Sequence, residues 1–380
     1  STIRLFCSLH KKFSGEWIMA YTTIDNPTKF FSTTLWVADN ASSRSLTGFG
    51  HQLDIVWTKH RDSGATNPTF TDSVRGGDKQ MGTSSNAAED SGSHGKISSF
   101  DSDGITVIDG TNGTYPRLYF NSLNPFGASV GGNYVGWSWK AGGSASSNSD
   151  GGITSSVSAN TTAGISVVSY AGTGSAATVG HGLGVAPRLI IIKNRSSTES
   201  WRVYHGGLGA TKEIYFDLTS AAGTSSSSFN DTEPTSSVFS VGTGNGTNKS
   251  GDNLIAYCFA EKQGFSKFAT YEGNGSSDGT FIYTGFRPAF LITKRADTGG
   301  DNWHILDNKR DIDNPTEQVL QTNEPTAEAT TTTSKIDFLS NGFKCRGTGS
   351  SINTSGLTYI YIAFAESPFV NSNGIPNNAR

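Results

Sequence analysis

The sequence predicts an all-β protein made of three tandem β-sandwich repeats of jelly-roll or lectin-like type. Three observations lead to this prediction. The chain is rich in turn residues, with 46 glycines among 380 residues, and its 7 Trp, 12 Tyr and 22 Phe supply large apolar surfaces for burial. A pattern of short apolar runs bounded by Gly and Pro, which is typical of strands, recurs three times along the chain.

Composition and charge exclude several classes of protein. The 29 basic and 32 acidic residues nearly cancel, so no basic excess is available for nucleic acid. No stretch approaches the ~18 consecutive apolar residues of a membrane helix. The three cysteines form neither a disulfide framework nor a zinc motif, and the histidines are scattered. We therefore expect no nucleic-acid partner, no membrane span, no metal and no cofactor.

The repeats are visible as residues that recur at constant offsets. The first and second repeats align at an offset of 134 residues, the second and third at 101, and the ends of the repeats at 120 and 105. The aligned sets are Trp36, Gly48, Gly50, Lys59 and Arg61 with Tyr170, Gly182, Gly184, Lys193 and Arg195; Tyr170, Gly184, Pro187 and Lys193 with Tyr271, Gly285, Pro288 and Lys294; and Gly131 and Trp139 with Gly251 and Phe259 and with Gly356 and Phe364.

Two strands of each repeat can be assigned. Apolar runs at 53–57, 189–192 and 290–292 are each followed by a lysine, whose ammonium we expect to reach solvent. Each repeat closes on a segment that is apolar on both faces, which predicts a central strand. These closing segments are residues 134–139, 254–259 and 359–364.

The repeats define the domain organisation. We expect β-sandwich repeats at 29–140, 165–262 and 263–370, and a tail at 371–380. Residues 141–164 are nearly all small and polar, which predicts a flexible linker or a solvent-exposed arm. We expect the first repeat to pivot about it, while the second and third pack rigidly.

The first 18 residues differ in character from the rest. Met19 begins a segment that reads like a natural protein start. We expect residues 1–18 to be a non-native upstream extension, with an ordinary N-terminal extension as the alternative.

Candidate binding residues follow the lysine strand of each repeat. An aromatic strand leads into an Asp-x-x-Arg motif in the first and third repeats, whereas the second repeat keeps the aromatic residues and loses the charges. Such residues can stack a sugar ring and bind its hydroxyl groups. The candidates are Asp72 and Arg75; Trp201, Tyr204 and His205; and Trp303, His304, Asp307 and Arg310. The structural alternative, which we favour, is an Asp–Arg pair that fixes a turn beside a core tryptophan.

We predict no catalytic residues. Glu261 and Glu366 recur after the closing strand, as a pair of carboxylates for glycoside hydrolysis would require, but the first repeat has Ala141 there. Acids that recur at the end of a strand are more often surface residues. A glycan depolymerase therefore remains only an alternative.

Eight short motifs are distributed along residues 19–380. They are MAYTTIDNP (19–27), DSVRG (72–76), FDSDGI (100–105), GWSWKAGG (136–143), HGLGVAP (181–187), IAYCFAE (255–261), TGFRP (284–288) and PNNAR (376–380). These motifs resemble a family of virion structural proteins of marine tailed phages, of the cyanophage and pelagiphage type, described as tail-fibre-like.

The resemblance implies a non-enzymatic virion protein, assembled in the host cytoplasm and acting outside the cell. Its expected role is that of a tail fibre or adhesin whose repeated domains recognise a host-surface glycan with the avidity of several weak sites. Its expected partners are other virion proteins and copies of itself, with a homotrimer by analogy. A capsid decoration or scaffold protein without receptor binding is the alternative.

Overall fold

The prediction of an all-β fold is confirmed. A computed structural model describes residues 9–13, 16–127 and 131–377, and this part of the chain contains 29 strands and four short helical turns. The strands form several antiparallel, sandwich-like sheets. The helical turns are η1 (Pro27–Lys29), η2 (Pro125–Gly127), α1 (Ser226–Phe229) and α2 (Asn245–Asn248).

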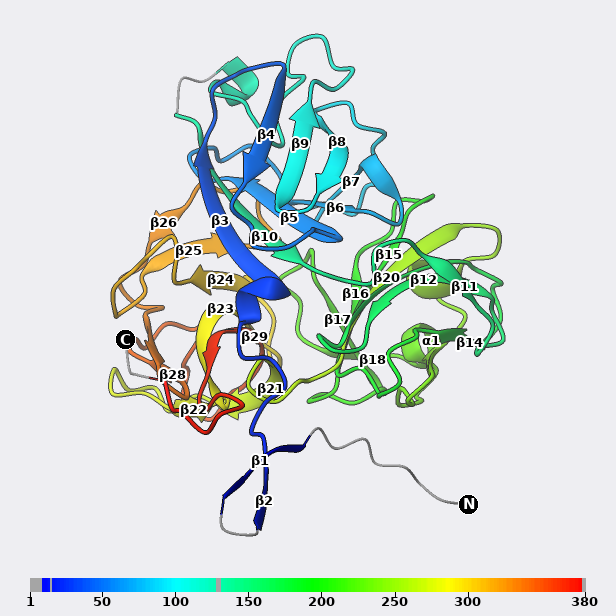
Figure 1. The fold of residues 1–380 in the computed structure, drawn as a ribbon. Coiled ribbons are helices and arrows are strands. Elements are labelled where there is room, and N and C mark those ends of the chain that lie inside the picture. The colour runs from blue at the N-terminus through cyan, green and yellow to red at the C-terminus, as the bar shows by residue number, and fades with distance from the viewer. Residues whose placement is uncertain (1–8, 14–15, 128–130, 378–380) are drawn as a thin grey trace.

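Three principal sheets organise the chain (Figure 1). The first has the order β3 (Phe31–Val37), β10 (Asn133–Trp139), β5 (Ile55–His60), β6 (Thr69–Asp72), β7 (Gly76–Gly82). The second has the order β11 (Ser146–Asn148), β12 (Ser155–Asn160), β13 (Ile165–Ala171), β20 (Asn253–Phe259), β15 (Leu189–Asn194), β16 (Arg202–His205), β17 (Lys212–Tyr215), β18 (Gly223–Thr224). The third has the order β21 (Ser266–Glu272), β29 (Thr358–Pro368), β23 (Phe286–Arg295), β24 (His304–Asp307), β25 (Gln318–Gln321), β26 (Ala329–Thr330). A run of five strands therefore has the same order in each sheet, with the closing strand in second place.

A smaller sheet covers one face of each principal sheet, and each pair encloses its own apolar core. The smaller sheets are β4 (Ser43–Thr47), β9 (Gly104–Ile108) and β8 (Lys96–Asp101); β14 (Ala177–Gly180) and β19 (Val238–Val241); and β22 (Phe281–Tyr283), β28 (Gly342–Cys345) and β27 (Ile336–Leu339). We call the three pairs of sheets the first, second and third lobes. A separate hairpin, β1 (Leu9–Phe13) and β2 (Glu16–Met19), precedes them.

The predicted central position of the closing strands is confirmed. β10 lies between β3 and β5, β20 lies between β13 and β15, and β29 lies between β21 and β23. In β10 and β20 every residue after the first is buried. Burial on both faces follows because one face meets the smaller sheet of its lobe and the other meets a core that all three lobes share.

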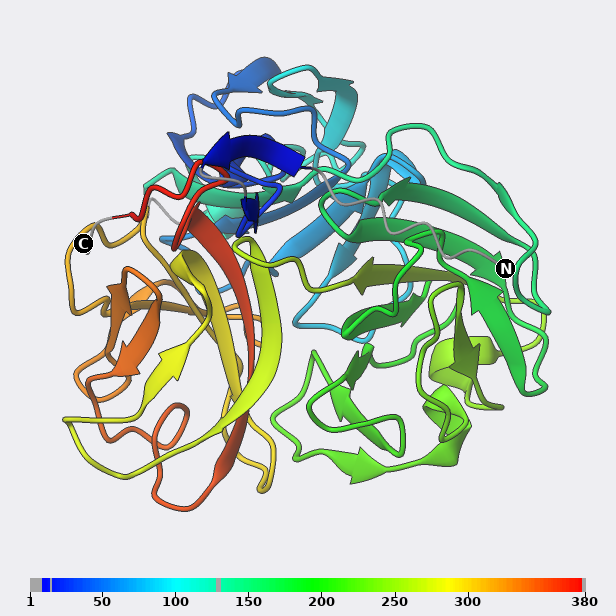
Figure 2. The same ribbon diagram turned by 60° about the horizontal axis from the view of Figure 1, so that its bottom comes forward.

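Figure 2 shows the three lobes arranged around a common centre, and the buried side chains of the shared core lie where they meet. The equivalent aromatic residues Trp139, Phe259 and Phe364 meet there edge to face. Their ring centroids are 6.2 Å apart for Trp139 and Phe259, 5.7 Å for Trp139 and Phe364, and 5.9 Å for Phe259 and Phe364. We call these three residues the aromatic triangle. Because it ties the first lobe to the other two, the structure does not support the expected pivot of the first repeat.

The lysines that end the apolar strands do not reach solvent, contrary to expectation. Lys59, Lys193 and Lys294 are at most 1% exposed. Each ammonium donates to the carbonyl oxygen of the following residue, at 2.9, 2.9 and 2.7 Å. Burial lowers the pKa of Lys59 to about 7 and those of Lys193 and Lys294 to about 8.

Each buried lysine also joins two lobes. Lys59 of the first lobe donates to the Pro325 carbonyl of the third lobe at 2.9 Å. Lys193 of the second lobe donates to Asn86 of the first at 3.1 Å, and Lys294 of the third donates to Thr219 of the second at 3.3 Å. The three contacts form a closed ring, so every lobe both gives and receives one such bond. Sequence alone could not reveal these partners, because each lies in another repeat.

Residues 141–164 are not a linker but part of the second lobe. They contain β11 and β12, which extend the principal sheet outward from β13. Ile153 before β12, Val157 within it and Ala163 in the turn after it are buried, so a few apolar residues suffice to anchor this small, polar segment.

Both ends of the chain make contacts, although residues 1–8, 14–15 and 378–380 lie outside the described part. The predicted upstream extension at 1–18 is therefore described only within β1 and β2. In the tail, the Ser372 amide donates to the Asp25 carboxylate at 2.6 Å, and Asn377 Nδ2 donates to the Ser340 carbonyl at 2.9 Å. These bonds hold the described part of the tail against the first residues before η1 and against the third lobe.

The aromatic triangle provides a test of the shared core. We expect Phe364→Ala to lower the free energy of unfolding by about 3–5 kcal/mol, because a buried ring is replaced by a cavity that all three lobes line. Chemical denaturation followed by tryptophan fluorescence measures the change. Ile312→Ala, which shortens a side chain that is 67% exposed, is the control and should change stability by less than about 0.5 kcal/mol. A loss below about 1 kcal/mol for Phe364→Ala would contradict a shared core.

Candidate functional site

The nine predicted binding residues lie at equivalent places in the three lobes. Asp72 ends β6, His205 ends β16 and Asp307 ends β24, the fourth strand of each shared five-strand run. All nine side chains belong to residues that are at most 9% exposed. Trp201, Tyr204 and Trp303 are at most 1% exposed, so no ring face is open to a sugar. The nine residues are therefore buried structural residues, as the alternative interpretation of the sequence predicts. They do not form a surface on which a sugar ring could stack.

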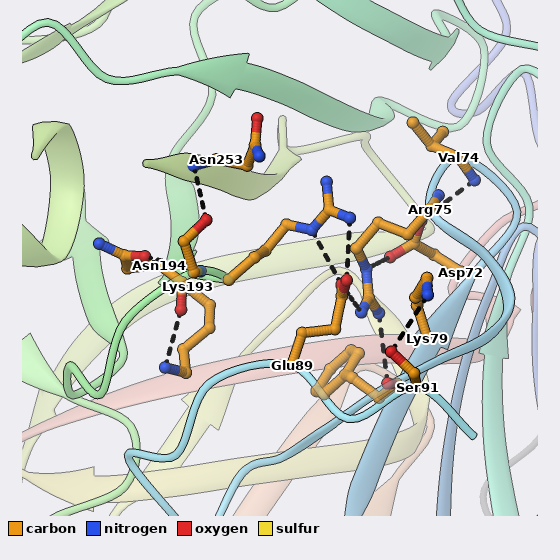
Figure 3. Close-up of polar contacts among 12 residues, drawn as sticks. Asp72, Val74, Arg75, Lys79, Glu89, Ser91, Lys193, Asn194 and Asn253 are labelled. Carbon is orange, nitrogen blue, oxygen red and sulfur yellow. Dashed lines mark hydrogen bonds and ion pairs between the residues drawn. The ribbon is translucent and has the colours of Figure 1, made fainter. Parts of the chain in front are cut away.

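Asp72 and Arg75 belong to a buried ion-pair network between the first and second lobes (Figure 3). Asp72 Oδ1 accepts the backbone N–H of Arg75 at 2.8 Å, which fixes the turn, and Asp72 Oδ2 accepts the hydroxyl of Tyr257 at 2.8 Å. Arg75 continues to Glu89 at 2.9 Å, and Glu89 also accepts Arg195 of the second lobe at 2.8 and 2.9 Å. Burial disfavours the charge on Glu89, but the two guanidinium groups outweigh it and lower its pKa.

Asp307 and Arg310 form a matching network between the third and first lobes. Asp307 Oδ1 accepts the Arg310 backbone N–H at 2.9 Å, and Asp307 Oδ2 accepts the indole N–H of Trp137 in the first lobe at 3.1 Å. Arg310 contacts Glu328 at 2.9 Å, and Arg61 of the first lobe contacts the same carboxylate at 3.1 Å. The two networks thus have the same plan, Asp–Arg–Glu–Arg, across two different junctions.

The junction between the second and third lobes lacks all four charges. His205, Leu208, Ala222 and Ala296 occupy the places of Asp, Arg, Glu and Arg. A backbone bond is common to all three junctions: the Ala222 N–H donates to the Ala296 carbonyl at 2.9 Å, as the Glu89 N–H does to Arg195 and the Glu328 N–H does to Arg61. The joint loss has a physical reason. A buried charge left without its partner is strongly destabilising, whereas an apolar set of suitable volume is tolerated. The missing charges in the second repeat therefore mark a coordinated change at a buried junction rather than a dispensable surface pair.

The remaining candidates also link lobes or fill cores. Trp201 donates its indole N–H to the Gly82 carbonyl of the first lobe at 3.0 Å, and Trp303 donates to Tyr215 of the second lobe at 2.9 Å. Tyr204 donates its hydroxyl to Glu233. Burial lowers the pKa of His304 to about 4, so its ring is neutral at neutral pH.

The two glutamates considered for hydrolysis are both paired. Glu261 accepts Lys267 Nζ at 3.0 Å, and Glu366 lies 3.1 Å from Arg287 and accepts Asn308 Nδ2 at 2.7 Å. Each carboxylate serves a local structural contact.

Sequence reasoning missed two surface features that are open to a ligand. The first is a cavity of about 360 Å³ on the first lobe, lined by Lys29, Phe30, His51, Gln52, Ser102 and Lys140. We call it the lysine cavity. Its residues are far apart in sequence, so no motif marks it.

The second feature is an aromatic pair on β22 of the third lobe. Phe281 is 44% exposed and Tyr283 is 53% exposed, while Ile282 between them is buried. We call these two residues the aromatic pair. The alternation over residues 281–283 was the only signal in the sequence that could have indicated it.

No metal or membrane feature emerges in the parts of the chain described. Across residues 9–13, 16–127 and 131–377, His, Cys, Asp and Glu side chains do not gather in threes in a way that would hold a metal ion. The helical turns in the same ranges are all too short to serve as membrane spans.

His205 provides a test of the buried junction between the second and third lobes. Its Nε2 lies 3.2 Å from the Tyr361 carbonyl and its Nδ1 accepts the Gly207 N–H, and burial lowers its pKa from 6.5 to about 4. Between pH 6.5 and 4 the unfolded histidine binds a proton that the folded one does not, so stability falls as the pH falls, by up to about 3 kcal/mol.

His205→Gln does not titrate and keeps a donor for the Tyr361 carbonyl. Its free energy of unfolding should therefore fall less steeply between pH 6.5 and 4 than that of the wild type, as measured by urea denaturation at each pH. His205→Leu should show the same shallow slope at lower overall stability, because it also lacks the hydrogen bond. Equal slopes for the wild type and His205→Gln would contradict a buried, neutral His205.

Comparison with known proteins gives a family but no function. No curated protein and no solved structure matches the chain. A family model described as a domain of unknown function (DUF7483) matches residues 26–368, which include all three lobes. The chain therefore belongs to the DUF7483 family.

Proposed function

We propose that the protein is a non-enzymatic virion structural protein of a tailed phage that binds a host-surface glycan through the aromatic pair. The observation that carries the binding part is the exposure of Phe281 and Tyr283, two rings on one face of a strand. The virion part rests on the sequence motifs that resemble phage tail-fibre-like proteins.

The aromatic pair has the chemistry that a sugar-binding surface needs. Rings at alternating positions of β22 point to the same side of the sheet, so they can stack against the apolar faces of sugar rings. The hydroxyl of Tyr283 lies 3.1 Å from that of Tyr21, and Tyr21 also donates to the Gly285 carbonyl at 2.8 Å. This contact orients the Tyr283 ring before any ligand arrives.

Polar side chains beside the pair supply hydrogen-bonding groups. Lys344 on β28 lies opposite Phe281 and contacts Asp278 at 2.6 Å. Arg346 lies 3.5 Å from Asp278 and 3.3 Å from Asp337. Charged groups held in such a network can meet sugar hydroxyls without large rearrangement.

The position of the pair suits recognition by a virion protein. β22 is the edge strand of the smaller sheet of the third lobe, on the side away from the shared core. A rigid scaffold that presents a binding strand at its periphery fits a tail fibre or adhesin. Assembly with other virion proteins, and with further copies of the chain as a homotrimer, would multiply weak contacts into useful avidity.

The aromatic pair can be tested by binding of the full chain to intact cyanobacterial or marine bacterial cells. We expect saturable binding by the wild type and at least about a tenfold loss of affinity for the double variant Phe281→Ala and Tyr283→Ala. The matched control is Phe126→Ala, which removes a ring of equal exposure, 44%, from the first lobe and should bind like the wild type.

Absence of binding by the wild type to every host tested would favour the decoration or scaffold alternative, and immuno-electron microscopy of virions would then separate head from tail. Equal binding by the wild type and the double variant would exclude the aromatic pair as the site. Release of reducing ends from host polysaccharide would instead support a depolymerase.

A further inference from the structure

We propose that the lysine cavity binds an acidic sugar residue, a sugar ring that carries a carboxylate or a sulfate group. This inference rests on the proposed function only for the expectation that the ligand is a glycan. The site itself is separate from the aromatic pair, because it lies on the first lobe and uses none of the same residues.

The fold brings the cavity residues together from four parts of the first lobe. Lys29 ends η1, and Lys140 follows β10, whose end is held beside η1 by a bond from the Lys140 N–H to the Phe30 carbonyl at 2.9 Å. His51 and Gln52 lie in the loop between β4 and β5, and Ser102 lies in the turn between β8 and β9. Because the backbone of the first lobe holds these segments together, the cavity is already formed before a ligand enters.

A glycine lets the loop approach η1 closely. Gly50 has a φ of +81°, and a Cβ atom there would lie 3.1 Å from the Thr28 carbonyl oxygen. The conformation and the space both disfavour a larger residue. The approach brings His51 and Gln52 to the same cavity as Lys29.

The two lysines supply the positive charge of the cavity. Within residues 9–13, 16–127 and 131–377, neither Lys29 nor Lys140 forms an ion pair or a side-chain hydrogen bond. Two carboxylates lie nearby, and Asp54 interacts electrostatically with Lys140, but both carboxylates form their hydrogen bonds with other groups. Asp103 accepts the backbone N–H groups of Gly48 and Gly50 at 3.2 and 2.6 Å. Asp54 accepts Ser73 Oγ at 2.9 Å and the Gly143 N–H at 3.3 Å.

The remaining walls suit a sugar ring better than a bare anion. Phe30 is half-buried and packs edge to face on Phe265, with ring centroids 6.0 Å apart, so its ring is held in place as an apolar wall. Gln52 and Ser102 offer amide and hydroxyl groups that have no partner among the described residues. The volume of about 360 Å³ lies within the range of small-ligand sites.

His51 contributes shape rather than charge. Its Nδ1 lies 2.9 Å from the Thr28 carbonyl oxygen and its Nε2 lies 3.2 Å from Ser138 Oγ, so both ring nitrogens are occupied. Burial lowers the pKa of His51 to about 4, which leaves the ring neutral at neutral pH. The positive charge of the cavity therefore comes from the two lysines and not from His51.

The test is calorimetric titration of the full chain with glucuronate, glucose 6-sulfate, glucose and inorganic sulfate at low and at physiological ionic strength. We expect glucuronate or glucose 6-sulfate to bind at least about tenfold more tightly than glucose and than inorganic sulfate, and to bind more weakly as salt is added. Whichever of the two acidic sugars binds more tightly identifies the anionic group.

Lys29→Gln and Lys140→Gln should each weaken binding of the acidic sugar by about three- to tenfold and together abolish it. Lys212→Gln, which removes a lysine on β17 of the second lobe, is the matched control and should bind like the wild type. The thermal unfolding temperature of each variant establishes that it is folded.

Three outcomes would overturn the proposal. They are no binding of either acidic sugar up to about 50 mM, affinity unchanged in both lysine variants, or inorganic sulfate binding as tightly as the acidic sugars. The double variant of the aromatic pair distinguishes the two proposals. If the double variant loses cell binding but still binds the acidic sugar, both the aromatic-pair proposal and the lysine-cavity proposal hold. If the wild type binds cells but binds no acidic sugar, only the lysine-cavity proposal fails.

Discussion

The rest of the structure depends on the contact among Trp139, Phe259 and Phe364. Each of these rings lies on the closing strand of a principal sheet, and each pair meets edge to face. A single β-sandwich can leave the outer face of its sheet to solvent, but here that face is covered by the other two lobes. The closing strands are therefore apolar on both faces. Small residues and turns can dominate the outer surface because burial at the centre supplies the apolar area that folding requires.

Polar contacts then fix how the lobes meet. Apolar packing is not directional, whereas a buried ammonium such as Lys193 stabilises the fold only where carbonyl oxygens from its own lobe and from its neighbour are both in place. The Asp–Arg–Glu–Arg networks add the same requirement at two junctions, since a shift of either lobe would leave buried charges unpaired. The third junction lacks those charges as a set and is held by the shared core, the lysine contact and hydrogen bonds such as that of Trp303 to Tyr215.

How far the sequence could predict the structure depended on where each residue finds its partner. The closing strands were predictable, because the local sequence pattern, as in residues 134–139, already indicates burial on both faces. The burial of the Lys59 ammonium was not predictable, because its acceptor at Pro325 lies in another lobe. For the same reason Asp72 and Arg75 could be recognised as a pair but not as half of a network that includes Glu89 and Arg195. The average composition of the segment 141–164 predicts a linker, whereas a few buried apolar residues such as Val157 hold it in the second lobe.

Recurrence along this chain marks the scaffold rather than the binding sites. The large side chains that recur in all three repeats, the lysines and the closing aromatic rings, are buried and hold lobes together. Residues that face solvent are free of that constraint, and there the lobes differ. Rings are exposed on β22, whereas β4, in the smaller sheet of the first lobe, exposes Ser43, Ser45 and Thr47. A search for function in such a protein should therefore begin with the exposed residues that do not recur, and the aromatic pair and the lysine cavity are both of that kind.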